Sequence, residues 1–415
     1  MGCREIRSWL TPDRARNYSL ILLVIASLAI IGWIAQSDGM VDRNGKPIGT
    51  DFSSFFAAGA LASEGRASEA YDMALHYARE QLLFGETTPH YAWLYPPSFL
   101  VFVTPLALLP YPAALGIWQG STLALYLAVI AGVLRGARLG SRLIARIWLP
   151  VAAAFPAVFI NLGHGQNGLL SAALFGGALL QLPRHPLIAG FLFGLLTYKP
   201  QLALVIPFAL LAGGQWRAIA AACVSALILA GISFLLFGAD VWWSFLASAG
   251  TSQKLLLEEG DVGFEKLQTL FAAVRMWGGS VILAYVAQGA VSGAAICCTA
   301  WIWRSNQSHE IKASLLLVAT TLASPHILDY DLMLLAPSLA FLVVARAQDH
   351  LRKYEISLLA AIWAAPLLAR PVAGLTGVPI GLLGTLALFI LIARTPNRAP
   401  ASLRGGSDVI AAHSL

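Results

Sequence analysis

The stretch GTDFSSFFAAG contains one acidic residue, Asp51, among three phenylalanines. A carboxylate is the ordinary side chain for removing a proton from an attacking hydroxyl group. Side chains that can carry positive charge occur much later in the chain, at Lys199, His164, His326 and Arg370. Positive charge and hydrogen-bond donors stabilise a departing phosphate. Together these residue types fit transfer of a group from a phosphate donor to a hydroxyl acceptor, if the fold brings them together.

Asp51 also has a plain structural interpretation. It could be a solvated loop acid, or part of the cap of a helix that carries Phe52 to Ala62, with Thr50 as the capping residue. The flanking aromatic residues predict that this helix is amphipathic and lies in the plane of a membrane interface. A functional role requires the cationic residues to lie on the same face of that membrane.

The composition indicates the kind of protein that must position these residues. Of 415 residues, 58% are hydrophobic and only 12% are charged, whereas soluble domains are about 25% charged. The mean hydropathy is +0.72. We therefore expect an all-α protein that crosses a membrane many times, and we attribute the net charge of +6 to its topology. Nucleic acid is not an expected partner, and the four cysteines lack metal-ligand spacing.

Apolar runs predict the membrane crossings. The first run, 18–35, follows an arginine-rich N-terminus and exceeds the roughly 7–15 residues of a signal-peptide core. We expect an uncleaved helix, with cleavage after Ala35 as the alternative. Further runs cover 98–109, 113–134, 147–161, 168–182, 187–198, 201–212, 217–237, 281–303, 313–325, 330–345, 356–369 and 377–393. Several are shorter than a full span of roughly 20 residues. They predict about 12 crossings, with 98–109 or 113–134 re-entrant.

Basic residues assign the loops to the two sides of the membrane. Under this topology the cytoplasmic side receives Arg135, Arg138, Arg142, Arg146, Arg184, Arg217, Arg304, Lys312, Arg346, Arg352, Lys353, Arg394, Arg398 and Arg404. Two long loops, 36–95 and 238–280, then face the periplasm of a bacterial plasma membrane, and the tail 395–415 is cytoplasmic. The candidate site residues fall on the periplasmic side. Gly190 and Gly194 have the spacing of closely packed helices.

Each periplasmic candidate has a structural alternative. Lys199 lies between two short apolar runs, where charge is costly, which favours contact with a donor over snorkelling to the interface. His326 follows a proline near a helix end and could equally bond a backbone carbonyl. His164 and Gln166 belong to NLGHGQN, which forms either a polar turn or part of a donor site.

The supporting candidates also have both a functional and a structural interpretation. Tyr95 precedes two prolines that fix re-entry of the chain into the membrane, and we place it on the acceptor side of the site. Asp329 supports the site, whereas Asp331 is better explained as a helix cap. Arg275, in the second long loop, is a candidate for the donor phosphate. The tryptophans of that loop fit an interfacial belt, with an acceptor-binding flap as the alternative.

Sugar transfer from a polyprenyl-phosphate donor fits this set of residues. The leaving group is already a phosphate, so it needs no general acid, while the acceptor hydroxyl needs a base. The donor's lipid tail needs an apolar groove that opens to the bilayer. Short or broken helices can line such a groove.

An ordered set of motifs supports the same chemistry. The set consists of GTDFSSFFAAGALASEGRASEAYD, YPP at 95–97, PLALLP at 105–110, GQN at 165–167, KPQ at 199–201, KLQTLF at 266–271, SPH at 324–326 and DYD at 329–331. In order and spacing it resembles glycosyltransferase family 87, which uses polyprenyl-phosphate sugars and includes the mycobacterial phosphatidylinositol-mannoside mannosyltransferases. The resemblance extends over roughly residues 18–345.

The resemblance implies a GT-C architecture, with one integral membrane domain over 1–415 and an active site at the extracytoplasmic surface. It implies inverting transfer of a hexose, with mannose as the expected sugar and Asp51 as the base. Lys199 and His326 match positions that meet the donor phosphate or sugar. The implied partners are a polyprenyl-phosphate-linked sugar, a lipid or glycan acceptor and membrane lipids. No cofactor or metal is expected, because Asp38, Asp42 and Asp72 do not adjoin Asp51.

Two other functions remain open at this point. A secondary transporter would carry internal repeats and ionisable residues near the midplane, whereas here the ionisable groups stand at segment ends. A flippase or polymerase of lipid-linked glycans would share the substrate but not the transfer step. An essential single carboxylate on the first loop would favour the transferase.

Overall fold

The computed structural model describes residues 9–136, 144–347 and 353–396. These residues form helices, with no β-strand beyond isolated bridges. The α-helices are α1 (Pro12–Ile34), α2 (Thr50–Ser63), α3 (Met73–Phe84), α4 (Pro97–Ala107), α5 (Tyr111–Arg135), α7 (Leu149–Ala153), α8 (Pro156–His164), α9 (Gly168–Gln181), α10 (Pro186–Leu195), α11 (Ile206–Ala212), α12 (Trp216–Phe237), α13 (Ala239–Gln253), α14 (Leu270–Met276), α15 (Val281–Arg304), α16 (His309–Ala323), α17 (Leu335–Ala345), α18 (Lys353–Thr376) and α19 (Ile380–Ala393).

Short 3-10 and π-helical segments complete the secondary structure. They are η1 (Ala67–Tyr71), η2 (Ile144–Trp148), η3 (Leu196–Tyr198), η4 (Pro200–Ala203), η5 (Lys254–Glu259), η6 (Phe264–Lys266) and η7 (Asp329–Leu334). Every predicted apolar run coincides with one or more of the helices. Outside the described residues lie Arg138, Arg142, Arg352, Arg398, Arg404 and residues 397–415 of the predicted tail.

Five of the described helices are long and apolar enough to cross a membrane, namely α1, α5, α12, α15 and α18. A sixth candidate span consists of residues 146–153 and α8, which meet at a 47° bend. Pro156 begins α8 at this bend, where its missing N–H and fixed φ interrupt the helical ladder. Other apolar helices, such as α4 and α9, are shorter. The chain is therefore a multi-pass membrane protein, and the count of about 12 crossings stays a prediction.

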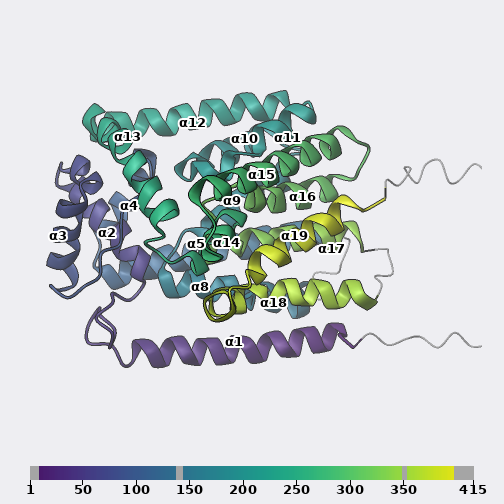
Figure 1. Cartoon of the computed structure of the whole chain (residues 1–415), viewed down its shortest axis with the longest axis horizontal. Coiled ribbons are helices and arrows are strands. Elements are labelled where there is room, and N and C mark those ends of the chain that lie inside the picture. The colour runs from purple at the N-terminus through teal and green to yellow at the C-terminus, as the bar shows by residue number, and fades with distance from the viewer. Residues whose placement is uncertain (1–8, 137–143, 348–352, 397–415) are drawn as a thin grey trace, which may run out of the picture.

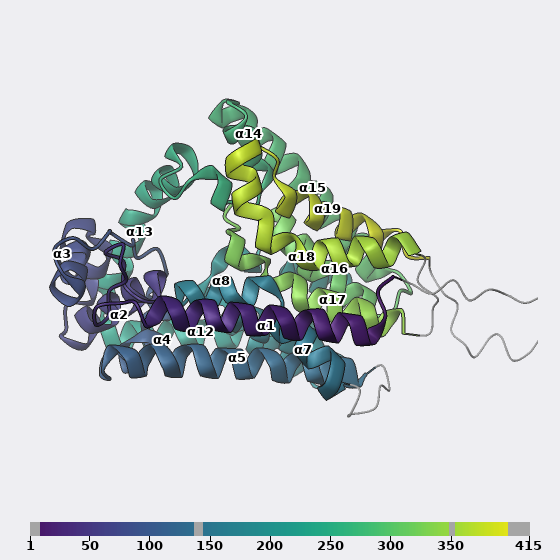
Figure 2. The ribbon, with the colours of Figure 1, turned by 90° about the horizontal axis from the view of Figure 1, so that it is seen from below.

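The two ends of the molecule differ in what they carry (Figure 1). The start of α1 and the ends of α5 and α19 lie at one end, and α2, α3 and α13 gather at the other. Figure 1 shows α1 running along the outside of the bundle, on the side opposite α12, and in Figure 2, seen from below, α1 lies in front of α12. Helix α1 packs on α7. The helix ends that carry Arg135 and Arg394 thus lie opposite the first-loop helices. This separation agrees with the predicted topology.

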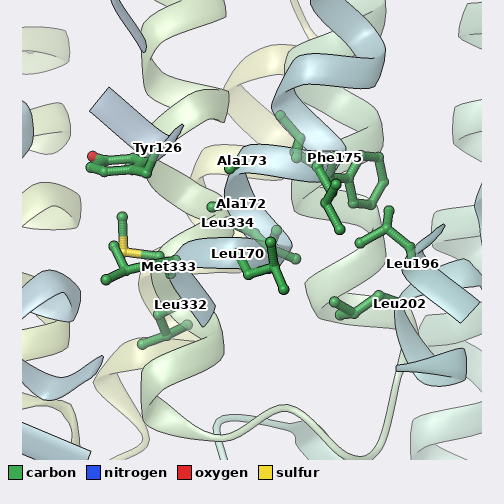
Figure 3. Close-up of a cluster of buried hydrophobic side chains, with 14 of the residues drawn as sticks. Tyr126, Leu170, Ala172, Ala173, Phe175, Leu196, Leu202, Leu332, Met333 and Leu334 are labelled. Atoms are coloured by element: carbon green, nitrogen blue, oxygen red, sulfur yellow. The ribbon is translucent and has the colours of Figure 1, made fainter. Parts of the chain in front are cut away.

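The core lies between α9, α16, α17 and η7. Small and branched side chains of α9 fill the space between Tyr126 and Met333 on one side and Leu196 and Leu202 on the other (Figure 3). On the adjoining side, α10 packs tightly on α12. A Cβ atom added at Gly190 would lie only 2.2 Å from the carbonyl oxygen of Ala218. The predicted close packing of this helix is confirmed.

Helix α2 differs from its predicted form. Every residue from Phe52 to Ala62 is buried inside the protein, so the expectation of an amphipathic helix in the interface plane is wrong. The ring of Phe55 makes edge-to-face contacts with four rings outside α2, those of Trp93, Tyr95, Phe99 and Trp118. The phenylalanines beside Asp51 therefore anchor the first loop to α4 and α5, and the helix begins at the bundle's aromatic core.

Candidate active site

Two helix ends bring the first candidates together. Asp51 lies in the first turn of α2, and His164 is the last residue of α8. Their nearest side-chain atoms, Oδ1 and Nδ1, are 3.8 Å apart. A helix N-terminus favours a carboxylate and a C-terminus favours a cation. The backbone of both helices therefore favours an acidic and a basic side chain at this meeting point.

Two glycines make this meeting possible. Gly49 precedes α2 with φ +72°, and Gly165 ends α8 with φ +63°. A Cβ atom at Gly165 would lie 2.5 Å from Cβ of Phe52, so a larger residue would separate the two helices. Residues with a Cβ atom are also sterically strained at positive φ. The predicted capping role of Thr50 is wrong, because the N-cap is Gly49 and Thr50 is already helical.

Gln166 fixes the orientation of the carboxylate. Its Oε1 accepts from the backbone N–H of Asn167 at 2.9 Å and from the hydroxyl of Tyr95 at 3.3 Å. Because the oxygen is occupied by two donors, the amide nitrogen must face the other way. It donates to Oδ2 of Asp51 at 2.8 Å. Three predicted site residues thus form one hydrogen-bonded chain.

The second carboxylate oxygen has only longer contacts with its neighbours. Oδ1 of Asp51 lies 3.4 Å from the Thr50 hydroxyl, which in turn lies 2.6 Å from Nδ1 of His164. The Asp51 side chain is 14% exposed and that of His164 is 25% exposed. A small hydroxyl group can therefore reach an oriented carboxylate, which is the geometry that a general base requires.

Lys199 occupies a different environment from the one predicted. Its side chain is 2% exposed, and its ammonium group pairs with Oδ1 of Asp331 at 2.5 Å and donates to Oδ1 of Asn167 at 3.0 Å. The other Asp331 oxygen accepts the N–H of Leu328 at the start of η7, as the predicted cap. These contacts favour a role in positioning η7. A contact between Lys199 and the donor stays a prediction.

Two loops join to bring further charge to the site. Leu267 and Leu328 form an isolated antiparallel bridge, and the N–H of Gln268 donates to the carbonyl of Ile327 at 2.8 Å. Lys266 consequently lies over the ring of Tyr330, 5.8 Å from its centroid.

Lys266 and Arg370 are the free cations of the site. Both act electrostatically on His164 and Asp329. Neither has an ion pair with any residue that the structure describes. Arg370 was expected on this face. Lys266 was named only as part of the motif KLQTLF and not as a predicted site residue. Its position near a membrane surface, four residues before the apolar helix α14, is the signal that could have identified it.

A comparison with known families decides what kind of protein has this site. Residues 93–325 match the model of glycosyltransferase family 87. The chain belongs to glycosyltransferase family 87. It is therefore a membrane glycosyltransferase, and the predicted family is confirmed. No curated protein and no solved structure gives a match, and the likeness to the mycobacterial enzymes stays a prediction.

The other predicted residues of this family 87 enzyme lie in several settings. His326 is half-buried between α16 and η7, and burial lowers its pKa to about 4, so it is uncharged at neutral pH. Asp329 is buried and accepts the N–H of Tyr330. Arg275 donates to the carbonyls of Gly279 and Glu258, at 2.8 and 3.0 Å. These contacts favour a role for Arg275 in shaping the second loop.

An apolar cavity is lined by segments that follow the two free cations in the chain. It has a volume of about 380 Å³ and is lined by residues of α14, α15 and α19 with the turn before α19, among them Leu270, Trp277 and Leu382. Helix α14 starts four residues after Lys266, and α18, which carries Arg370, leads into the same turn. A second cavity of about 540 Å³ lies beside the start of α1 and is lined by other residues.

Proposed function

We propose that this family 87 glycosyltransferase transfers a hexose from a polyprenyl-phosphate-sugar donor to a hydroxyl group of a lipid or glycan acceptor. The expected sugar is mannose, and the reaction takes place on the periplasmic face of a bacterial plasma membrane. The observation that carries this proposal is the Asp51 carboxylate, which Gln166 orients and which remains partly exposed beside His164.

In this reaction Asp51 accepts the proton of the acceptor hydroxyl as its oxygen attacks the anomeric carbon. The bond between that carbon and the phosphate oxygen breaks, and polyprenyl phosphate leaves with the bonding electron pair. Attack from the face opposite the phosphate inverts the anomeric configuration. No acid is required for departure, because the leaving phosphate is already stable as an anion.

The free cations provide the place for the phosphate. Lys266 and Arg370 have no ion-pair partner among the described residues, and charge-assisted hydrogen bonds to phosphate are among the stronger polar contacts. The apolar cavity lined by α14, α15 and α19 is within the size range of ligand pockets, about 300–1,000 Å³. It suits the first isoprene units of the donor. Neutral His326 can bond the donor sugar but adds no positive charge at pH 7.

The proposal is tested by sugar transfer in membranes from cells that express the protein. Radiolabelled polyprenyl-phosphate-mannose serves as donor and the native lipid extract as acceptor pool. Asp51→Asn should lower the rate by about 10²–10⁴, the usual contribution of a general base. Asp38→Asn, an exposed acid in the same loop, is the control and should keep the wild-type rate. Equal labelling by wild type and Asp51→Asn would remove Asp51 from the mechanism.

The phosphate site is tested separately through the donor KM. Lys266→Met and Arg370→Met should each raise it about 10–100-fold, because a hydrogen bond to a charged group contributes about 1.5–3 kcal/mol. Lys254→Met changes an exposed lysine of the same loop and should leave KM unchanged. If KM stays constant in the first two variants, the phosphate binds elsewhere. A flippase would instead move the lipid without needing Asp51.

A further inference from the structure

Three side chains of the first loop converge in one buried place that the transfer reaction does not use. His76 and Glu80 are four residues apart on α3 and therefore lie on the same face of that helix. His90 comes from the connection between α3 and α4. One nitrogen or oxygen from each of the three lies within 4.8 Å of the others. The side chains of His76 and Glu80 are each no more than 1% exposed.

The three side chains share an unusual property. His76 Nδ1, Glu80 Oε1 and His90 Nε2 are buried and have no hydrogen-bond partner among the described residues. Buried polar atoms in folded proteins nearly always have a partner, because an unpaired one pays its full desolvation cost. Three side chains that cluster together, each with such an atom, indicate that they share a ligand.

Contacts on the outer side of the cluster orient these atoms inward. His76 Nε2 lies 3.3 Å from the carbonyl oxygen of Ser54, so that nitrogen carries the proton and Nδ1 offers its lone pair. Glu80 Oε2 accepts the N–H of Tyr91 at 3.0 Å and lies 4.0 Å from His76 Nδ1, which holds the carboxylate beside the imidazole while Oε1 stays without a partner among the described residues. Metal-binding histidines and carboxylates are held by outer contacts of this kind.

We propose that His76, Glu80 and His90 bind one divalent transition-metal ion, for which zinc is the best match. Two imidazole nitrogens and one carboxylate oxygen suit zinc, whereas magnesium and calcium prefer oxygen ligands. Zinc bonds of about 2.0–2.1 Å place tetrahedral ligand atoms about 3.4 Å apart. The side chains must therefore close by about 1 Å from their present spacing, and a water molecule can supply the fourth ligand.

The position of the cluster gives the ion a structural role. It joins α3 to the connection that leads into α4 and, through the carbonyl of Ser54, to α2. Ser54 is three residues after Asp51, so the ion braces the helix that carries the base. His76 and Glu80 are fully buried and His90 is partly buried, which suits an ion that holds the loop together, and the three are positioning residues.

Metal content of the purified protein tests the proposal directly. The full chain is purified in detergent with an affinity tag that contains no histidine, loaded with zinc, desalted and measured by mass spectrometry for metals. We expect about one zinc per chain in the wild type and at least about tenfold less in Glu80→Gln and His90→Gln, since losing a ligand weakens binding at least as much as losing an outer contact. His185→Gln changes an exposed histidine and should bind as the wild type does.

A second readout does not depend on the variants folding. Zinc should raise the unfolding temperature of the wild type, and a chelator should reverse the rise, because a ligand that binds only the folded state stabilises it. Cobalt loaded into the wild type should give the visible absorption of a four-coordinate site. The proposal is overturned if the wild type retains no more zinc than Glu80→Gln, or if zinc leaves its unfolding temperature unchanged. The three side chains would then interact only through hydrogen bonds and not through a metal ion.

Discussion

Replacing Lys199 by methionine should destabilise the protein severely. The substitution keeps the length and apolar stem of the side chain but removes the ammonium group from its pair with Asp331. The Asp331 carboxylate is 1% exposed, so it would stay buried and lose its only ion-pair partner among the described residues. Breaking a buried pair in this way costs about 3–5 kcal/mol. The free energy of unfolding, measured by reversible denaturation in mixed micelles, should fall by that amount.

Removing both charges should restore most of the loss. Asn at position 331 still offers an oxygen to the N–H of Leu328, which Asp331 accepts at 3.2 Å. Buried pairs replaced as a unit often leave stability nearly unchanged. The double variant Lys199→Met with Asp331→Asn should therefore lie within about 1 kcal/mol of the wild type, so that adding Asp331→Asn recovers about 2–4 kcal/mol of the stability that Lys199→Met loses.

The same double variant separates two roles for Lys199. If Lys199 only positions η7, the stable double variant should transfer sugar with the wild-type donor KM. If it also meets the donor phosphate, as the sequence predicted, KM should rise about tenfold or more despite restored stability. Single variants that each cost less than about 1 kcal/mol, with no coupling between them, would refute the buried ion pair itself.

Three smaller changes test the rest of the site. Gln166→Leu removes the amide that orients Asp51 and should lower kcat about 10–100-fold with little change in donor KM, measured in the transfer assay. Gly165→Ala should cost about 1–3 kcal/mol in unfolding experiments, because it strains a positive φ and presses on Phe52. His326 has its pKa lowered to about 4 when folded, so the unfolded chain binds the extra proton between about pH 6.5 and 4. Stability should fall as the pH drops through that window, and His326→Gln should remove about 2 kcal/mol of this loss in pH-dependent unfolding. An unchanged acid profile would contradict the burial of the ring.

Much of the fold and part of the site could be predicted from the sequence. Apolar runs mark helices because a chain in lipid must satisfy its own backbone hydrogen bonds, and each predicted run coincides with helix in the structure. Polar residues at the ends of such runs are few, so Asp51, His164 and Gln166 could be placed on one face before any coordinates were known. The structure brings these three together.

Other features depend on partners that are distant in the sequence. Interfacial and buried aromatic helices have the same local pattern, and only packing against Phe99 and Trp118 decides that α2 is buried. The partner of Lys199 lies 132 residues later, so its ion pair left no local signal. His76 and Glu80 are four residues apart on α3 but were not among the predicted site residues, and the third member of the cluster, His90, comes from an irregular connection.

The limits of the family match bear on the role of Asp51. The match covers residues 93–325 and does not include α2. The contacts that fix the carboxylate nevertheless come from inside the matched region: Gln166 binds it, Tyr95 orients Gln166, and His164 and Gly165 form the helix end against which α2 packs. Without an acid at this position, the Gln166 amide would lose its acceptor. The matched region is therefore shaped to hold a carboxylate that lies outside it. This makes Asp51, at the rigid N-terminus of a buried helix, a better candidate for the base than the other first-loop acids, such as Asp72, which only caps α3.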